Sequence, residues 1–264
     1  METLIQIYVV FHKYLLNDCY KDKNFDHKYF TFFKCNEKYP PQYDSNFGYN
    51  IKYEKDCEIY NPELQNESKP YMAVSAIYHI YKNNIYKKHN YIGFMEYDLV
   101  LKPDPKLIKN LGTTDLYDDY FKSKQTMVEI IKNICNNNKK HIIILSGRYN
   151  FQEFYNEKNM IDNINLFDKI INEFNDFYKV NHSVEKLLEK NPIICDQQSF
   201  MCDNETFETI MKFISHIIEN KYVEVKGFRP SYLLARYIGV TLELIDVETT
   251  LLSLQHLSRH EWTG

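Results

Sequence analysis

The sequence predicts an α/β fold, a single domain with a mostly parallel, mixed central sheet flanked by helices. Two observations carry this prediction. Short apolar runs such as 4–10 and 91–95 show no polar alternation, which is typical of strands covered on both faces of a sheet. Amphipathic helical patterns such as 71–83 alternate with these runs, as in a sheet that carries helices on its faces.

The elements follow one another along the whole chain. The first strand, 4–10, is followed by a region up to about residue 70 that is rich in Tyr, Lys and Asn, for which we expect long loops with short strands or helices. After 71–83 and 91–95, the pattern predicts an apolar run at 99–101, a helix at 126–136, a strand at 141–145, one or two helices within 161–178, a helix at 183–189, a strand at 193–195 continued by 199–202, helices at 206–219 and 229–239, and a last apolar run at 242–245. No repeat or linker divides the 264 residues.

Composition excludes several classes of protein. The net charge of -4 argues against a nucleic-acid-binding protein that depends on neutralising phosphates. Six cysteines without C-x-x-C spacing indicate reduced thiols, and we expect a cytoplasmic compartment. No signal peptide or integral membrane segment is predicted. The abundance of Asn, Lys, Tyr and Ile indicates an AT-rich source, such as a large DNA virus.

The most informative stretch is the strand 91–95, which runs directly into Glu96 and Asp98. In an extended chain these two side chains point the same way, because a strand repeats every two residues. Their repulsion is relieved if a cation lies between them, and hard oxygen ligands suit Mg²⁺ or Mn²⁺. The sequence therefore predicts a metal and diphosphate site here. The alternative is a surface turn that happens to carry two acids.

Three further predicted strands also stop at polar residues. The polar clusters are His12-Lys13, Glu96-Tyr97-Asp98, Ser146-Gly147-Arg148 and Asp196-Gln197-Gln198. If the strands are parallel, all four clusters lie at the carboxyl edge of the sheet, where ligands of such folds bind. Such a set suits a metal-bound diphosphate leaving group that is displaced by a hydroxyl. No Walker-type or G-x-G-x-x-G loop is present to hold phosphates.

Several segments resemble glycosyltransferases of the GT-A fold, and within them a bacterial and viral group named DUF4422 that is linked to capsular polysaccharide synthesis. The resemblance lies in 7–13, which ends in His-Lys, in 71–83 with the following Tyr91-Ile92-Gly93, and in 199–207 and 232–236. That group usually has His-Tyr-Arg-Arg after the central Gly, where this chain has Glu96-Tyr97-Asp98. The chain is therefore closer to metal-dependent GT-A enzymes with a DxD-like motif, in which the second acid binds Mn²⁺ or Mg²⁺.

The resemblance implies roles for the candidate residues. Asp98 and Glu96 would bind the metal, and in GT-A enzymes a residue near the end of the chain often adds a third ligand, for which His256 and His260 are candidates. The donor would contact His12, Lys13, Glu96, Tyr97, Arg148 and Gln197, with residues 1–100 forming the nucleotide-sugar half and 101–264 the acceptor half. Lys13 and the two histidines each have a structural alternative. Lys13 would be a solvated surface residue, and the histidines would belong to a surface tail. Arg148 would contact either the acceptor or the diphosphate.

Asp196 is the candidate catalytic base that would take the proton of the acceptor hydroxyl, and its alternative is a helix N-cap. Arg229 and Arg236 are expected to form ion pairs.

The predicted function is transfer of a sugar from a nucleotide-diphosphate donor to a hydroxyl of a glycan, lipid-linked sugar or protein. Asp196 as base would invert the anomeric centre, and without such a base a retaining route is favoured. Two alternatives stay open. One is a metal-dependent nucleotidyltransferase, and the other is an inactive glycan-binding or structural protein on the same fold. The oligomeric state is not predicted.

Overall fold

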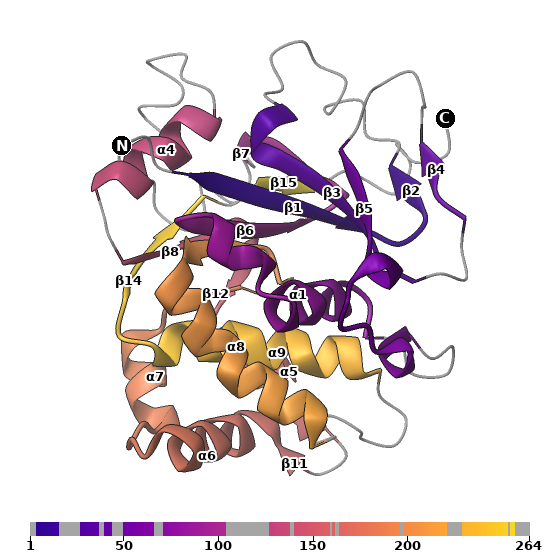
Figure 1. Cartoon of the computed structure of the whole chain (residues 1–264). Helices are drawn as coiled ribbons and strands as arrows, with labels where there is room; N and C mark the ends of the chain where they lie inside the picture. Colours follow the sequence, from indigo (N-terminus) through magenta and orange to yellow (C-terminus); the bar gives the residue numbers. More distant parts are fainter. Residues whose placement is uncertain are drawn as a thin grey trace.

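A seven-stranded mixed sheet forms the centre of the protein (Figure 1). The computed structural model describes residues 4–15, 27–36, 40–43, 50–65, 71–103, 127–137, 140–158, 160–161, 164–195, 198–220, 229–252 and 254–256. In spatial order, the strands of the sheet are β14 (Glu248–Leu251), β8 (His141–Ile144), β13 (Phe200–Asp203), β6 (Tyr91–Glu96), β1 (Ile5–Phe11), β3 (Phe30–Lys34) and β5 (Ile51–Tyr53).

The strand directions confirm the predicted mostly parallel, mixed sheet. β1 pairs in parallel with β3 and with β6, β3 pairs in parallel with β5, and β14 pairs in parallel with β8. β13 is antiparallel to both of its neighbours, β6 and β8. The start of β13 therefore lies at the same edge of the sheet as the carboxyl ends of β1, β6 and β8.

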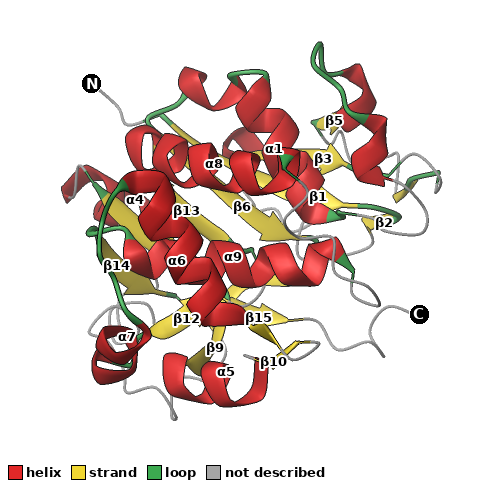
Figure 2. Ribbon diagram, turned by 90° about the horizontal axis from the view of Figure 1, so that it is seen from below, coloured by secondary structure: helices red, strands yellow, loops and turns green. Residues whose placement is uncertain are grey.

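The uninterrupted apolar strands are explained by two cores, one on each face of the sheet. In β1, Tyr8 and Val10 enter a core formed with α1 (Ala73–Lys82), α8 (Asn204–Glu219) and α9 (Pro230–Leu244). Ile7 and Val9 enter the opposite core, which includes side chains of α4 (Met127–Asn137). Figure 2 shows α1, α8 and α9 across one face of the sheet. Because both faces are covered, no polar alternation remains in the strand.

The remaining elements lie around this centre. The other helices are α5 (Phe151–Lys158), α6 (Leu166–Tyr178) and α7 (Val184–Lys190), with 3-10 turns η2 (His27–Tyr29), η3 (Glu54–Asp56), η4 (Pro62–Gln65) and η5 (Ile85–Lys88). Two-stranded pairs are formed by β2 (Tyr14–Leu15) with β4 (Gln42–Tyr43), β7 (Leu99–Pro103) with β15 (Leu254–His256), β9 (Gly147–Asn150) with β12 (Ile193–Cys195), and β10 (Met160–Ile161) with β11 (Ile164–Asn165).

One sequence prediction of the fold was wrong. The run 199–202 does not continue the strand at 193–195, because β12 pairs with β9 outside the central sheet and β13 enters that sheet separately. The segment 30–34 is the fully buried strand β3, within the region for which loops with short strands or helices are expected. The apolar run 242–245 is the end of α9, which continues to Leu244, and the last strand of the central sheet is β14.

Gly239 allows α9 to pass close to β12. A Cβ atom at this position would lie 2.5 Å from the carbonyl oxygen of Cys195 and 3.0 Å from Cγ2 of Ile194. The nearest neighbour is a backbone atom, which cannot rotate away. A glycine in the middle of a helix costs stability on its own, so its place here is explained by close packing and it does not end the helix.

We predict that Gly239→Ala destabilises the protein by about 1–3 kcal/mol, the usual cost of overpacking a core. The measurement is urea unfolding of the variant and of wild type. Gly93→Ala in β6 is the matched control, because its Cβ would lie 3.2 Å from Met201 and 3.3 Å from Ile7, both side chains, and the cost should be smaller than at 2.5 Å from a backbone oxygen. A Gly239→Ala variant as stable as wild type would contradict the close approach.

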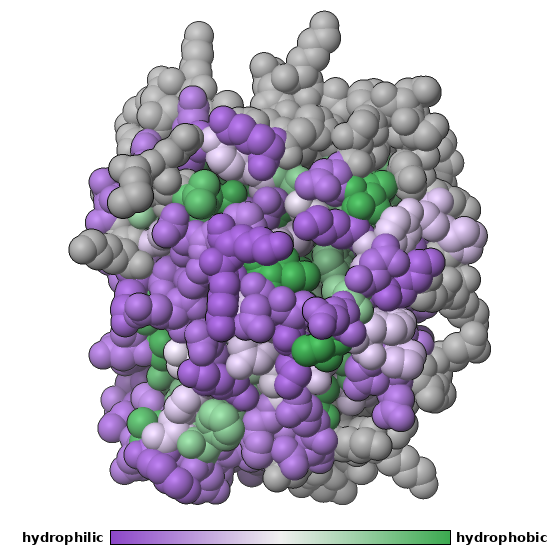
Figure 3. All heavy atoms as spheres, viewed as in Figure 1, coloured by the Kyte–Doolittle hydropathy of each residue, from purple (hydrophilic) through white to green (hydrophobic). Residues whose placement is uncertain are grey.

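The described cysteines form no disulfide, and large apolar residues are mostly buried. Cys35, Cys57, Cys135, Cys195 and Cys202 are all free thiols. The face shown in Figure 3 is mostly hydrophilic, with hydrophobic residues in small separate groups. Among the described helices, none has both the length and the apolar composition needed to cross a membrane.

Candidate active site

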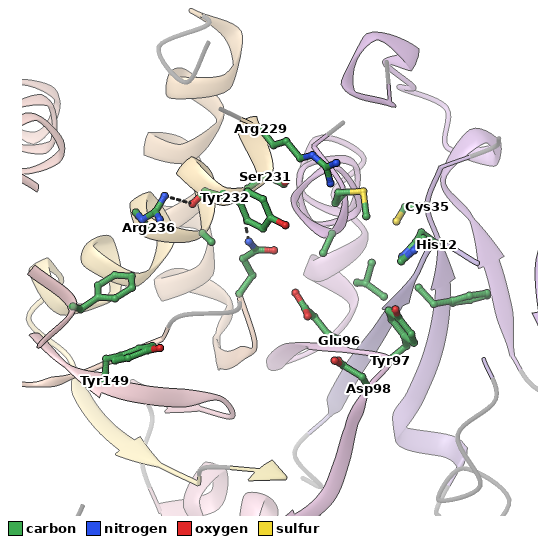
Figure 4. Close-up of a pocket in the computed structure, with 17 residues that line it drawn as sticks. His12, Cys35, Glu96, Tyr97, Asp98, Tyr149, Arg229, Ser231, Tyr232 and Arg236 are labelled. Carbon is green, nitrogen blue, oxygen red and sulfur yellow. Dashed lines mark hydrogen bonds between the residues drawn. The ribbon is translucent and has the colours of Figure 1, made fainter. Parts of the chain in front are cut away.

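A cavity of about 440 Å³ opens at the carboxyl edge of the central sheet (Figure 4). Its walls come from the ends of β1, β3 and β6, the start of α1, β9 and α5, Gln198 two residues before β13, and the segment from Arg229 through the first half of α9. The lining residues are Val10, Phe11, His12, Cys35, Met72, Ala73, Glu96, Tyr97, Asp98, Tyr149, Phe154, Gln198, Arg229, Ser231, Tyr232, Ala235 and Arg236.

The acidic motif forms one wall of the cavity. β6 ends at Glu96, and Tyr97 and Asp98 form the turn into β7, so the strict strand alternation expected from the sequence does not apply. All three residues nevertheless line the cavity. The motif is held in place on both sides, because the Tyr97 N–H donates to the carbonyl oxygen of Val10 at 3.2 Å and the Glu96 N–H donates to Oγ of Ser199 at 3.3 Å. Two carboxylates are thus fixed at the end of a central strand.

His12 lies beside this motif, at the end of β1. Its ring meets the ring of Tyr97 edge to face, with 5.5 Å between the ring centroids. Burial lowers the pKa of His12, and the neighbouring Lys34 and Lys13 lower it further, whereas Asp98 raises it. A lowered pKa means that the ring is neutral at pH 7, when it offers one hydrogen-bond donor and one acceptor. Lys13 is near enough to affect His12 but is not part of the cavity lining.

The first half of α9 forms another wall, which carries positive charge. Tyr232 and Arg236 are four residues apart and share one helical face, and Arg229 is the residue just before the helix. In Figure 4 Arg229 points toward His12 and Cys35, and Arg236 lies on the opposite side of the cavity, the same side as Tyr149. Neither arginine forms an ion pair with any residue that the structure describes, so the expected ion pairs are absent from this part of the chain.

A hydrogen bond from Gln198 connects the segment before β13 to α9. Its side-chain amide donates to the carbonyl oxygen of Ser231 at 3.2 Å, and the residue is buried. Gln198 has φ of 54° and Met72 has φ of 52°, both in the left-handed region that non-glycine residues seldom adopt. Both line the cavity, and strained backbone of this kind is concentrated at functional sites.

The structure describes only some of the predicted site residues in the segment 196–198 and in β9. Asp196 and Gln197 lie outside the described residues. Arg148 is in the backbone of β9, and its side chain is outside the described part. Its neighbour Tyr149 does line the cavity and stacks on Phe154, with 6.0 Å between the ring centroids.

The C-terminal strand comes back to the acidic motif. β15 pairs antiparallel with β7, and the register places His256 opposite Leu99, the residue that follows Asp98. The side chain of His256 and the whole of His260 lie outside the described part of the chain. The backbone register therefore brings one of the two predicted histidines next to the acids.

We predict that His256→Ala raises the Mn²⁺ concentration needed for nucleotide-dependent stabilisation by about tenfold or more, because a metal ligand is lost. Metal-free nucleotide binding should stay unchanged. The measurement is a thermal-shift titration with Mn²⁺ at a fixed nucleoside diphosphate concentration, with Gln255→Ala as the control in the same strand. Equal losses with and without Mn²⁺ would mean that β15 only packs. His260→Ala is measured in the same way.

The donor set fits a divalent cation that is shared with a ligand. Glu96 and Asp98 offer hard carboxylate oxygens to one cavity. Mg²⁺ is usually held by one or two carboxylates and completes its shell with waters and substrate phosphates. Within the described residues, no group of three His, Cys, Asp or Glu side chains comes together. The two acids therefore suit an ion that is bound together with a phosphate, and not a closed protein cage.

A second polar cluster, formed by the buried side chains of Glu54, Ser75 and His79, is structural. Nδ1 of His79 lies 2.7 Å from Oε1 of Glu54, and the Ser75 hydroxyl donates to the same oxygen. The backbone N–H of Asn61 donates to Nε2 of His79 at 2.8 Å, so this nitrogen is an acceptor and the ring proton is on Nδ1. With Nε2 already occupied, His79 cannot serve Ser75 as a base. The cluster joins η3 to α1, whose start lines the cavity.

The α/β fold is similar to that of a solved glycosyltransferase. The solved structure of WbbM, described as a bifunctional glycosyltransferase in its apo form, matches this chain with a TM-score of 0.59 and 13% sequence identity. The match covers 97% of this chain and 46% of WbbM, so the chain spans about half the length of that protein. At this identity the likeness shows the fold. No family model and no curated protein sequence matches the chain.

Proposed function

We propose that this chain is a glycosyltransferase that moves a sugar from a nucleotide-diphosphate donor to a hydroxyl of a glycan, lipid-linked sugar or protein. The observation that carries the proposal is the meeting, in one cavity, of Glu96 and Asp98 at the end of β6 with Arg229, the residue just before α9. Carboxylates suit a metal, and arginines suit phosphate or carboxylate oxygens. The likeness to the WbbM fold supports the same reading.

In this proposal the donor diphosphate lies between the acidic motif and Arg229. Glu96 and Asp98 would hold Mn²⁺ or Mg²⁺, which would offset the negative charge that develops on the leaving diphosphate. Arg229 adds a positive charge that is always present, because a guanidinium does not lose its proton in proteins. The neutral His12 and the ring of Tyr97 fit the nucleotide part of the donor. Lys13 remains a weaker candidate, because it does not line the cavity.

The acceptor hydroxyl needs a group that takes its proton. We assign this role to Asp196, which lies in the sequence between β12 and the cavity residue Gln198. A direct displacement with Asp196 as base inverts the anomeric centre. Donor contacts then come mainly from residues 1–100 and acceptor contacts from residues 101–264, with Arg229 as an exception. We leave Gln197 and Arg148 as donor contacts proposed on sequence grounds.

The finer family assignment rests on sequence pieces alone. We propose that the chain belongs with the DUF4422 group because of 7–13, 71–83 and 232–236, and that its DxD-like motif makes it a metal-dependent member. A cytoplasmic location and an AT-rich, viral source are proposed on the cysteines and the composition. No nucleic-acid partner is proposed.

A thermal-shift screen tests this function. The purified chain is heated with UDP-, GDP-, ADP- and dTDP-sugars, each with and without Mn²⁺, and a ligand that binds only the folded state raises the melting temperature. At a concentration of about a hundred times the dissociation constant, the gain is about 2.7 kcal/mol. We expect at least one nucleotide sugar to stabilise the chain in a Mn²⁺-dependent way. Stabilisation by nucleoside triphosphates alone would instead support a nucleotidyltransferase, and no stabilisation by any nucleotide would overturn the proposal.

A further inference from the structure

Arg236 has an unusual environment for an arginine. Its side chain lines the cavity, and one guanidinium nitrogen, Nη1, donates to the carbonyl oxygen of Tyr232 at 3.2 Å. Its Nε is buried and has no hydrogen-bond partner among the described residues. A buried donor without a partner is unfavourable, because it has lost water and gained nothing in return.

The charge of Arg236 is not balanced by an acid within the described part of the chain. Burial lowers the pKa of its guanidinium, and no described carboxylate acts to raise it again. The group still carries its charge at pH 7, since arginine does not lose its proton in proteins. A half-buried cation that faces a cavity and lacks an acid partner is a suitable anchor for an anionic ligand group.

Three aromatic rings line the same cavity as this arginine. Tyr232 is 60% exposed although it is large and partly apolar. Tyr149 stacks on Phe154 with an interplanar angle of 26°, and all three rings line the cavity. The small Ala235 also lines the cavity. Flat aromatic faces with polar tips can cover the apolar C–H face of a sugar ring while hydroxyl groups are bonded at its rim.

This end of the cavity is separate from the part assigned to the donor. Figure 4 shows Arg236 and Tyr149 at one end and His12 and Cys35 at the other, with Glu96 between them. Under the proposed function, the donor diphosphate lies with Glu96, Asp98 and Arg229. Arg236 is then left for the second substrate.

We infer that the end of the cavity formed by Arg236, Tyr232 and Tyr149 binds an acceptor sugar that carries a negative charge, either a carboxylate or a phosphate ester. Arg236 holds the anionic group through the charge and the remaining N–H donors of its guanidinium, and the tyrosine rings hold the sugar face. This inference rests on the proposed function for the identity of the donor end, but acidic-sugar binding can be measured without turnover.

The first arm of the test is ligand-observed NMR binding. Methyl glucuronide and glucose 6-phosphate are compared with methyl glucoside, so the two acidic sugars separate carboxylate from phosphate recognition. Wild type should bind at least one acidic sugar about ten- to a hundredfold more tightly than the neutral sugar, the range for one hydrogen bond to a charged group. In Arg236→Gln the preference should disappear. Equal binding of the acidic and neutral sugars by wild type would overturn the inference.

The second arm separates acceptor from donor recognition. Nucleoside diphosphate with Mn²⁺ is titrated into wild type, Arg236→Gln and Arg236→Lys. Binding should stay within about twofold in both variants, and Arg236→Lys should keep part of the acidic-sugar preference because the charge remains while the fork is lost. Lys212→Gln on α8 is the matched control for loss of a cation on a helix, because Lys212 pairs with Glu208 outside the cavity.

The two arms also distinguish the two proposals. A tenfold loss of nucleoside diphosphate binding in Arg236→Gln, with the sugar preference intact, would place Arg236 at the donor and overturn the inference while supporting the proposed function. Acidic-sugar binding that depends on Arg236, without any nucleotide binding, would support the subsite and overturn the proposed function. Melting temperatures of the variants confirm that each is folded.

Discussion

Asp98→Asn is expected to abolish Mn²⁺-dependent binding of the nucleotide donor while the fold stays intact. The substitution keeps the size of the side chain but removes its negative charge, and a metal shared with phosphates depends on that charge. Because Asp98 lies in the turn after β6 and lines the cavity, its loss removes no core packing. Sugar transfer should fall by at least about a hundredfold, as when one major electrostatic contribution to the transition state is removed.

The measurement is isothermal titration with nucleoside diphosphate at several Mn²⁺ concentrations. Asp176→Asn is the matched control, because Asp176 is an exposed aspartate on α6 away from the cavity. The control should bind as wild type does. Metal-dependent binding that survives in Asp98→Asn would remove the acidic motif from the site.

Asp196→Asn is expected to lower sugar transfer by at least about a hundredfold with near-normal melting and donor binding, because a general base contributes about 10²–10⁴-fold in rate. Asparagine caps a helix nearly as well as aspartate but cannot accept the proton. The N-cap of the next helix, α8, is Asp203, whose Oδ1 accepts from the N–H groups of Glu205 and Thr206. The helix-cap role is therefore filled by another residue.

Comparing kcat and donor binding in Asp196→Asn with those in Asp203→Asn separates chemistry from capping. Asp203→Asn should lower the stability, because both oxygens of Asp203 accept hydrogen bonds, Oδ2 from the His141 N–H and the Thr206 hydroxyl, and an amide nitrogen cannot accept; transfer should stay close to wild type. If Asp196→Asn transfers sugar within a few-fold of wild type, the base lies elsewhere and the inverting route loses its support.

Long apolar runs and regular helical spacing were sufficient to predict strands and helices. The sequence did not predict features for which one pattern fits two structures. The apolar runs of β1, β6 and β8 and the helical spacing of α1 and α8 were sufficient to place these elements. The direction of β13 was not predicted, because a strand covered on both faces looks the same in either direction. The position of β3 was not predicted, because its aromatic residues stand in a Tyr-, Lys- and Asn-rich region with little periodicity.

The candidate site was predicted only where it lies at the ends of strands. Glu96, Asp98 and His12 follow apolar strands, and the carboxyl edge of the sheet brings them together. The cavity wall formed by Arg229, Tyr232 and Arg236 was not predicted, because these residues reach the cavity through the packing of α9 on β12. One signal was present: Tyr232 and Arg236 share a helical face. We had assigned the arginines to ion pairs, the commoner role for such residues.

Gln198 reaches the cavity in a way that the sequence did not indicate. The prediction placed the segment Asp196-Gln197-Gln198 at the carboxyl end of a parallel strand. In the structure, Gln198 lies just before β13, and the antiparallel direction of that strand brings it to the same edge. The expected location was therefore correct for Gln198, although the assumed strand direction was wrong.

The most direct test of the central claim is turnover with a nucleotide sugar. The chain is incubated with the nucleotide sugar that stabilises it most, Mn²⁺ and an acidic or neutral sugar acceptor, and the products are identified by mass spectrometry. The account predicts a nucleoside diphosphate and a glycoside enlarged by one sugar unit, both lost when Mn²⁺ is removed by a chelator and in Asp98→Asn. Release of inorganic pyrophosphate from a nucleoside triphosphate, with no glycoside formed from any nucleotide sugar, would contradict it.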